Sequence, residues 1–335
     1  MQLKSIVSYT LGAVLLSAAV TSHAEVSEVK IAEQYGIGYL PLMIMEDQKL
    51  VEKYAKEEGL GDLKVTWSKF AGGNVMNDAL LSDSLQFASG GVAPMVTLWA
   101  KTRGNYDVKA VGALNSMPLL LNTRNPKVKT IKDFTDKDKI ALPAVKVSIQ
   151  AVTLQMAAEK AFGAGQQDKL DHLTVSMSHP DGMEALLSGT SEVTAHFSAP
   201  PFQYLELKQP GIHTVLNSYD VLGGPATFNL VWATSKFRND NPKVYLAFTR
   251  ALDEAMTMIN RDKKWAAQAY LRISKDKESV DDIVKMLSDP QVKFTTTPQN
   301  VTKYVDFMQR TGAIKAKPSS WKDMFFPNVH NLPGS

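Results

Sequence analysis

Small-residue loops at the starts of expected helices are the parts of this sequence best suited to hold a ligand. Residues 89–92 (SGGV) follow an apolar strand pattern and precede a helical one, and residues 72–74 and 144–148 occupy similar places. Backbone N–H groups in the first turn of a helix have no partner within that helix, so they can donate to a ligand oxygen. The same residue types also make ordinary helix caps, and that structural interpretation stays open. The ligand-binding candidates in these loops are Gly73, Asn74, Ser89, Gly90, Gly91, Val92, Lys146 and Ser148.

Aromatic rings stand beside the same loops. The first expected strand-to-helix loop carries two tyrosines, and an expected strand in the second half of the chain ends in a histidine and a phenylalanine. A ring next to donor amides suits a small ligand with one flat or apolar part and one polar or anionic part. Packing in the core is the alternative for each ring. The candidates added on this ground are Tyr35, Tyr39, His196, Phe197 and Phe228.

The sequence carries none of the common catalytic or phosphate-binding motifs. Residues 36–38 begin a dinucleotide-binding fingerprint, but Pro41 stands where its third glycine would be. The chain has no cysteine, which excludes thiolate nucleophiles, disulfides, iron–sulfur ligation and the acylated cysteine of a lipoprotein. No two histidines are spaced as metal ligands. We therefore expect no catalytic residue, no bound metal and no cofactor.

Composition places the chain among ordinary globular proteins. It has 335 residues, enough for two domains of average size, and 44% of them are hydrophobic. The formal net charge is only +3 and no long run of like charges occurs, so a surface that follows a phosphate backbone is not expected. Nucleic acid is thus excluded as a partner at this stage.

The first 24 residues have the pattern of a cleaved secretory signal. Lys4 supplies the positive start, residues 6–20 are apolar, and Ala24 ends a small-residue exit. The alternative is an N-terminal membrane anchor, but a span needs ~20 apolar residues and this stretch is shorter. We expect residues 1–24 to be removed and the mature protein to be periplasmic and not a lipoprotein.

The mature chain alternates strand, loop and helix patterns. Strand patterns at residues 28–32, 64–70 and 85–88 are each followed by a glycine-containing loop and a helical pattern, at 41–55, 75–81 and 94–101. Such alternation predicts an α/β fold with mainly parallel sheets flanked by helices. A polar break at residues 123–126 (TRNP) ends this half.

The alternation of strand, loop and helix patterns then begins again, and short sequence segments recur in it. Residues 30–32 (KIA) recur at 139–141, and residues 78–82 (DALLS) recur as 184–188 (EALLS). If this echo is more than coincidence, the protein has two similar lobes with equivalent loops. We expect lobe one to comprise residues 25–117 and 223–335 and lobe two residues 118–222. Two hinge crossings would lie near residues 117–122 and 217–226.

The order of several segments resembles the periplasmic substrate-binding proteins of nitrate/sulfonate/taurine-type ABC importers, within the wider group named for thiamine-pyrimidine synthesis proteins. The resemblance spans roughly residues 28–270. It departs from the common pattern at residues 136–139 (DKDK), where many members have Lys-Gly-Lys, and at residues 189–195. The segments that carry it are residues 38–41 (GYLP), 77–81 (NDALL), 89–94 (SGGVAP), 130–134 (TIKDF), 139–143 (KIALP) and 183–189 (MEALLSG).

This resemblance implies a two-lobed periplasmic binding protein of type II that captures a small solute between its lobes and delivers it to a membrane permease. We also expect a monomer. Sulfonate-like or taurine-like, pyrimidine-like and aromatic-acid solutes stay open, and the scarcity of arginine in the candidate loops argues against nitrate. The alternatives are a periplasmic ligand sensor and an exported enzyme with His179 or His196 as general base. A perturbed histidine paired with a carboxylate in the cleft would favour the enzyme.

Overall fold

The computed structural model describes residues 24–335, and the expected leader, apart from Ala24, lies outside them. A first group of strands has the order β2-β1-β3-β10-β4. β1 pairs parallel with β2, and Ile31 of β1 bridges in parallel to Phe87, just before β3. β10 lies between β3 and β4 and is antiparallel to both. The bounds are β1 Glu28–Glu33, β2 Lys64–Lys69, β3 Ala88–Gly91, β4 Val108–Ala113 and β10 Asn229–Thr234.

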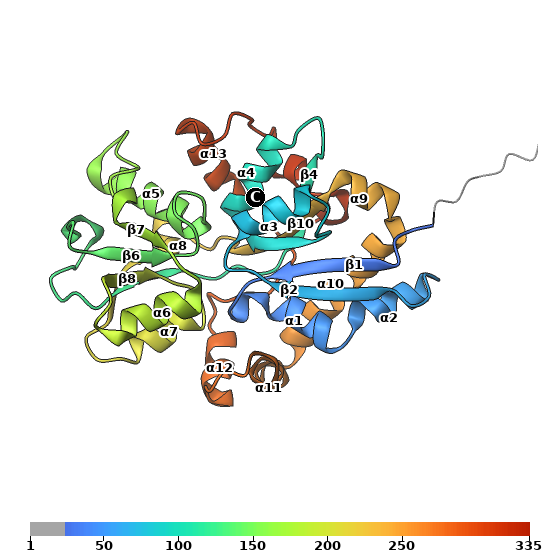
Figure 1. Ribbon diagram of the computed structural model, residues 1–335, viewed down its shortest axis with the longest axis horizontal. Helices are drawn as coiled ribbons and strands as arrows, with labels where there is room; N and C mark the ends of the chain where they lie inside the picture. The colour runs from blue at the N-terminus through green and yellow to red at the C-terminus, as the bar shows by residue number, and fades with distance from the viewer. Residues whose placement is uncertain (1–23) are drawn as a thin grey trace, which may run out of the picture.

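A second sheet has the order β7-β6-β8-β5-β9. β6 is parallel to β7 and β8, whereas β5 is antiparallel to β8 and β9. Figure 1 shows this sheet and its helices on the left, separated from the first group on the right, so the two form distinct lobes. The bounds are β5 Leu120–Thr123, β6 Lys139–Leu142, β7 Thr174–Ser176, β8 Val193–Phe197 and β9 His213–Asn217.

The two lobes share one strand order, with a single antiparallel strand in the fourth place. The expectation of mainly parallel sheets is confirmed, since four of the five strands of each lobe run in the same direction, with one antiparallel strand among them. In each lobe the antiparallel strand, β10 or β5, is the first that the chain enters after crossing from the other lobe. The chain enters each lobe on the side where the carboxyl ends of the parallel strands lie. The entering strand must therefore run in the direction opposite to theirs. The two-lobed α/β fold with two crossings is as predicted.

The recurring sequence segments lie in equivalent elements of the two lobes. Residues 30–32 lie in β1 and residues 139–141 in β6, which hold the same place in their sheets. The second pair of segments lies in α3 and α6, the helices that precede β3 and β8. Their bounds are Gly73–Leu81 and His179–Ser188. The echo therefore reflects equivalent elements of two similar lobes.

Helices cover the sheets of both lobes (Figure 1). The single helix expected at residues 41–55 is two helices, because Lys49 adopts a left-handed conformation with φ of 49°. β3 reaches Gly91, so residues 89–91, expected as a loop, pair with β10 instead. The remaining helices are α1 Leu40–Asp47, α2 Leu50–Glu57, α4 Val92–Lys101, α5 Ile149–Phe162, α7 Phe202–Leu207, α8 Ser218–Leu222, α9 Ser235–Asp240, α10 Pro242–Arg261, α11 Lys263–Ser274, α12 Val280–Leu287 and α13 Val301–Arg310.

The C-terminal helices contact both lobes. The apolar side of α10, which includes Phe248, packs in the first lobe, where Phe248 stacks on Phe87 with ring centroids 3.9 Å apart. α12 reaches α7 of the second lobe through an ion pair of Asp282 with Lys208 at 2.9 Å. α13 lies beside α5, and Arg310 forms two hydrogen bonds with the carboxylate of Glu159 (Figure 1). The last part of the chain therefore connects the lobes on two sides.

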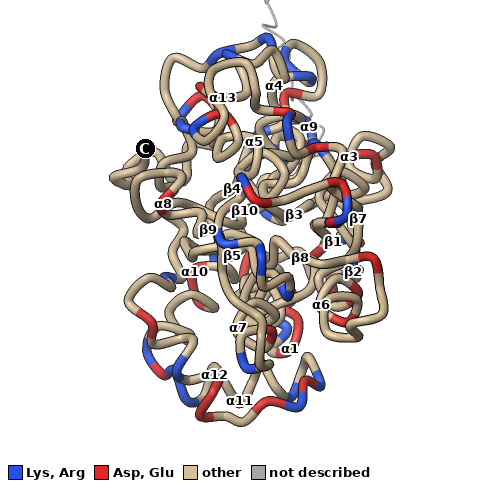
Figure 2. Tube along the Cα trace, turned by 90° about the vertical axis from the view of Figure 1, so that its left-hand side faces the viewer, with Lys and Arg blue, Asp and Glu red and all other residues tan. Residues whose placement is uncertain are grey.

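Charged residues of both signs are interspersed over the outside of both lobes in the view of Figure 2. This agrees with the small net charge of the sequence. Within residues 24–335, no helix has the length and apolar character needed to cross a membrane.

Candidate functional site

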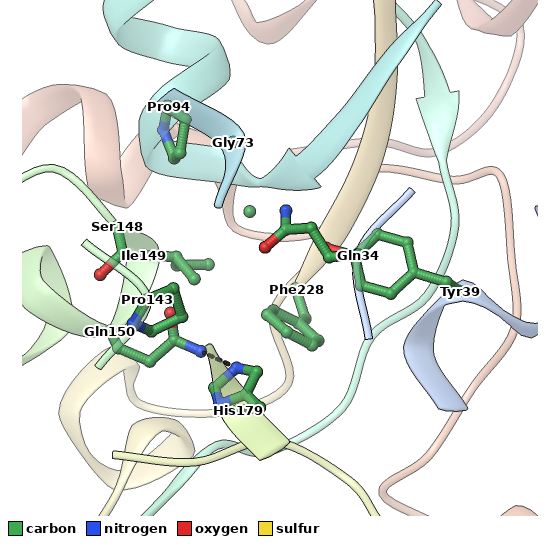
Figure 3. A pocket seen from close by; sticks show the side chains of 11 residues that line it. Gln34, Tyr39, Gly73, Pro94, Pro143, Ser148, Ile149, Gln150, His179 and Phe228 are labelled. Carbon is green, nitrogen blue, oxygen red and sulfur yellow. Dashed lines mark hydrogen bonds between the residues drawn. The ribbon is translucent and has the colours of Figure 1, made fainter. Parts of the chain in front are cut away.

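A small cavity lies between the lobes, at the ends of the parallel strands (Figure 3). Its volume is about 20 Å³, which is room for about one water molecule. The lobes are therefore nearly closed on each other. The lining residues of the first lobe are Gln34, Tyr39, Gly73, Gly91, Pro94 and Phe228, and those of the second are Pro143, Ser148, Ile149, Gln150 and His179.

Equivalent positions of the two lobes face each other across this cavity. Gln34 directly follows β1, and Pro143 directly follows β6. Gly73 begins α3 as His179 begins α6. A cavity built from matching loops of two similar lobes is the arrangement expected of a ligand cleft at the carboxyl ends of parallel strands.

Helix starts supply hydrogen-bond donors around the cavity. Gly91 is the N-cap of α4, and Ser148 is the N-cap of α5, where its Oγ accepts a hydrogen bond from the Ala151 N–H at 3.2 Å. Ser178 caps α6 in the same way. Because only part of each first turn is satisfied by such a cap, the remaining N–H groups can donate to a ligand.

No residue with a formal charge lines the cavity, within the chain from Ala24 onward. Its polar side chains are Gln34, Gln150, Tyr39, Ser148 and His179. Burial, followed by the neighbouring His196, holds the pKa of His179 well below its usual value, so this ring is neutral near neutral pH. The lining therefore offers hydrogen-bonding groups and the ring of Phe228, but no partner for an ion pair.

On the side of the first lobe, two hydrogen bonds orient the polar groups. Gln34 Nε2 donates to the Ser89 carbonyl at 3.3 Å, and the Tyr39 hydroxyl donates to Asn229 Oδ1 at 3.1 Å. Figure 3 shows the side-chain oxygen of Gln34 directed toward the middle of the cavity. The first lobe therefore offers an acceptor to a ligand.

On the side of the second lobe, a buried chain of hydrogen bonds runs inward from the cavity. Gln150 Nε2 lies 3.2 Å from His179 Nε2, and His179 Nδ1 lies 3.0 Å from His196 Nε2. His196 Nδ1 lies 2.6 Å from Glu206 Oε1, and Asn122 Nδ2 donates to Glu206 Oε2 at 2.8 Å. The side chains of His196 and Glu206 are completely buried. The sequence analysis named a perturbed histidine paired with a carboxylate in the cleft as a feature that would favour an enzyme. His196 has the carboxylate but lies behind His179, which lines the cavity.

Glu33, next to Gln34 along the chain, is a buried carboxylate. It is 1% exposed, its Oε1 lies 3.4 Å from Lys69 Nζ, and its Oε2 has no hydrogen-bond partner among the described residues. Burial raises the pKa of Glu33 to about 8; Lys69 opposes this rise and Glu46 adds to it. The folded protein therefore binds a proton here that an unfolded chain releases near the ordinary value of 4.5.

We expect the stability of the protein to fall as the pH rises from about 4.5 to about 8, to the extent that Glu33 governs it. The sign follows because, in this window, the folded state binds more protons than the unfolded state. Glu33→Gln should remove this slope. Urea unfolding at the two ends of the window tests it, with the exposed Glu184→Gln as the matched control. Equal slopes for Glu33→Gln and the wild type would contradict the assignment.

The structure brings part of the predicted site together. The predicted residues that line the cavity are Tyr39, Gly73, Gly91, Ser148 and Phe228. The others lie elsewhere: Tyr35 and Lys146 are exposed, and Asn74 faces a neighbouring surface pocket beside α4. The buried residues beside the cavity or behind it are Ser89, Gly90, Val92, His196 and Phe197.

Several lining residues were not among the sequence candidates. They are Gln34, Pro94, Pro143, Ile149 and Gln150, together with His179, which the sequence analysis considered only as a catalytic base. Gln34 and Pro143 follow strands that the alternation predicts, so the rule that ligands bind at strand ends could have found them. No comparable signal distinguishes Ile149 or Gln150.

The sequence profile of the NMT1-like family matches residues 22–274. None of the curated proteins matches the sequence significantly.

Solved structures share the fold at low sequence identity. The alkanesulfonate-binding protein SsuA from Xanthomonas axonopodis pv. citri, bound to MOPS, has a TM-score of 0.65 and 16% identity, covering 87% of this chain and 93% of that one. The periplasmic aliphatic sulphonate-binding protein SsuA from Escherichia coli gives 0.63 and 18%, covering 90% and 92%. The periplasmic nitrate-binding protein NrtA from Synechocystis PCC 6803 gives 0.66 and 16%, covering 90% and 84%. These likenesses establish the periplasmic binding protein fold.

Proposed function

Because this chain belongs to the NMT1-like family, we propose that it is the periplasmic solute-binding component of an ABC importer. The observation that carries the proposal is the cavity between the lobes, lined by equivalent loops of both. The names of structural neighbours, which are sulfonate-binding and nitrate-binding proteins of the periplasm, support it. The mature chain would begin after residue 24 and act as a monomer that hands its solute to a membrane permease.

Hinge closure is the proposed mechanism. The present cavity is too small for an organic solute, so the lobes must separate for entry and close again around the bound molecule. The two crossings near residues 117–122 and 217–226 would bend. The closed lobes touch near the cavity, where the Ile37 N–H donates to the Pro200 carbonyl at 3.1 Å and Gly91 packs on Ile149. A permease that reads only the closed form would then distinguish loaded from empty protein.

The lining of the cavity limits the solute class. Without a cationic side chain there, a small inorganic anion would lack an ion-pair partner, whereas helix starts can hold the oxygens of a sulfonate or carboxylate. Phe228 and Tyr39 suit a flat ring, and the two glutamines suit its polar edge. We propose a small organic solute and place pyrimidine-like compounds first, ahead of sulfonate-like or taurine-like compounds and aromatic acids.

A thermal-shift screen of residues 25–335, refolded to remove any co-purified ligand, tests the proposal. The panel contains pyrimidines, alkanesulfonates, taurine, nitrate and aromatic carboxylates. A ligand of the native state at about 100 times its Kd adds ~2.7 kcal/mol of stability, which is readily measured. We expect a hit among the organic solutes that is recovered unchanged. Binding of nitrate alone, or of nothing in the panel, would count against this solute assignment.

An exported enzyme is the second candidate, because His179 lines the cavity and connects through His196 to a buried carboxylate. Such a chain can orient a general base. However, His179 Nε2 already lies within hydrogen-bond distance of Gln150. Consumption of the hit in the same screen, followed by mass spectrometry, would favour the enzyme over the binding protein.

A further inference from the structure

The buried chain from Gln150 to Glu206 has one direction of hydrogen bonding, set by its inner end. Glu206 accepts from Asn122 on one oxygen and lies 2.6 Å from His196 Nδ1 on the other. An ionised carboxylate only accepts, so His196 must carry a proton on Nδ1. If His196 is otherwise neutral, its Nε2 accepts the Nδ1–H of His179.

The outer end of the chain agrees with this direction. His179 then has a bare Nε2, which must accept a hydrogen bond, and the atom placed 3.2 Å away is the donor Nε2 of Gln150. With this N–H used, the side-chain oxygen of Gln150 stays available to a ligand; Figure 3 shows it beside Pro143, which also lines the cavity. Five side chains, all less than 6% exposed, therefore fix one direction of hydrogen bonding at this wall of the cavity.

One added proton reverses the two outer hydrogen bonds of the chain, between Gln150 and His179 and between His179 and His196. A proton that enters from the cavity at His179 Nε2 allows the His179 Nδ1 proton to pass to His196 Nε2, 3.0 Å away. His196 is then an imidazolium paired with Glu206, while His179 is neutral again with its proton on Nε2. Gln150 must now accept from His179, so its amide turns and its NH2 group faces the cavity.

We infer that Glu206, His196 and His179 form a proton-controlled selector that decides whether Gln150 offers an acceptor or a donor to the solute. This inference rests on the proposed binding function of the cavity. A solute whose edge carries N–H or O–H donors would bind the neutral chain. A solute that offers only acceptors would bind with uptake of one proton. The reason is that two donors, or two acceptors, that face each other in a buried site weaken binding. His179 and His196 are positioning residues in this scheme.

The surroundings place the added proton on His196. The charged group that meets His196 directly is the Glu206 carboxylate of α7, whereas His179 has Gln150, His196 and the ring of Phe202 around it. Burial keeps the pKa of His179 well below its usual value. Other ionisable groups on the packed elements are remote or solvated: Asp181 and Glu184 of α6 are exposed, and Lys139 of β6 pairs with Val193 at the far end of β8.

Nitrogen NMR of the solute-free chain labelled with ¹⁵N-histidine tests the selector without any ligand. When both rings are neutral, we expect His179 and His196 as Nδ1–H tautomers, a form that is uncommon for a free imidazole. On acidification, His196 should become doubly protonated while His179 changes to the neutral Nε2–H tautomer at the same midpoint. In a chain labelled with ¹⁵N-glutamine as well, the side-chain amide signal of Gln150, assigned through Gln150→Asn, should shift with them.

Two variants distinguish the proton-controlled selector from hydrogen bonds that only stabilise the fold. Glu206→Gln should break the shared midpoint, because an amide can donate as well as accept, whereas Glu184→Gln on the exposed face of α6 should leave it unchanged. An Nε2–H tautomer of His179 at high pH, independent titration of the two rings, or no change in either would overturn the inference. The wild-type titration decides the matter even if Glu206→Gln does not fold. Since it needs no solute, its failure is distinct from a failure of the ligand screen.

Discussion

Gly91→Val is expected to weaken solute binding at least about 100-fold while both lobes remain folded. A Cβ at Gly91 would lie 2.5 Å from Ile149 Cγ2 and 2.6 Å from Ile149 Cβ, across the interface between the lobes. The backbone of Gly91, at φ −67° and ψ 162°, suits any residue, so the first lobe need not change. Because Ile149 Cβ is fixed to α5, the lobes must move apart instead. A 100-fold loss corresponds to ~2.7 kcal/mol of closure.

The measurement pairs affinity with lobe separation. The chain has no cysteine, so Lys56→Cys and Lys132→Cys, both exposed and on different lobes, can carry spin labels for distance measurement. We expect the distance between the two spin labels in Gly91→Val to stay at its value in the open form when the solute from the screen is added. Gly112→Ala is the matched control, since its new Cβ would meet only ordinary contacts at 3.6 Å. Normal affinity and normal closure in Gly91→Val would show that the lobes do not close as the structure has them.

Neighbouring Gly90 is not a substitute for this test. A Cβ at Gly90 would lie 2.8 Å from Gln34 Nε2 and 3.2 Å from Trp232 Cη2, both in the first lobe. Trp232 is completely buried, and its Nε1 donates to Asn77. A side chain at Gly90 would therefore disturb the core of one lobe, and a loss of binding there would not report on closure.

Glu206→Ala is expected to lower the free energy of unfolding by about 3–5 kcal/mol. The substitution leaves His196 Nδ1 and Asn122 Nδ2 facing an empty space in a region that is 0% exposed. Both groups then lose a charge-assisted partner without gaining water, which costs more than the removed contacts alone. The loss should exceed that of any exposed glutamate in the protein.

Urea unfolding, followed by circular dichroism, measures this difference. Glu184→Ala, an exposed position on α6, should stay within ~0.5 kcal/mol of the wild type. The double variant with His196→Ala should lose less than the sum of the single losses, because the two side chains contact each other. A loss below about 1 kcal/mol for Glu206→Ala would mean that water or another residue replaces the carboxylate.

The sequence predicted the elements of the fold better than their directions. Alternating patterns and the repeated segments located β1, β6, α3 and α6, because period-2 and helical patterns reflect local burial. Nothing local in β5 or β10 reveals that each runs against its neighbours. That direction depends on where the chain returns from the other lobe, which is a property of the whole topology.

The same limit applies to the site. Tyr39, Gly73, Gly91, Ser148 and Phe228 were found because strand ends and helix starts converge on the cavity. The sequence alone does not indicate which side of a loop faces the cavity. Tyr35 is therefore exposed although it precedes Tyr39 by one short turn, and Lys146 is exposed at a positive φ of 65°.

His196 and Phe197 show the difficulty at a strand end. Both are completely buried in β8, between β6 and β5, so strand alternation gives no polar face to choose. His196 reaches the cavity only through His179, a residue 17 positions earlier in the chain. Such a relay requires contacts between α6 and β8 that a single sequence does not reveal.

The position of β10 has a consequence for the order in which the protein can fold. All five strands of the second sheet occur consecutively, between Leu120 and Asn217, whereas β10 of the first lobe begins only at Asn229. During synthesis from the N-terminus, β3 and β4 therefore keep the edges that pair with β10 unpaired until the chain has passed Thr234. Fragments that stop before β10 should aggregate or be degraded, and the second lobe, although later in sequence, should be the first to complete its sheet.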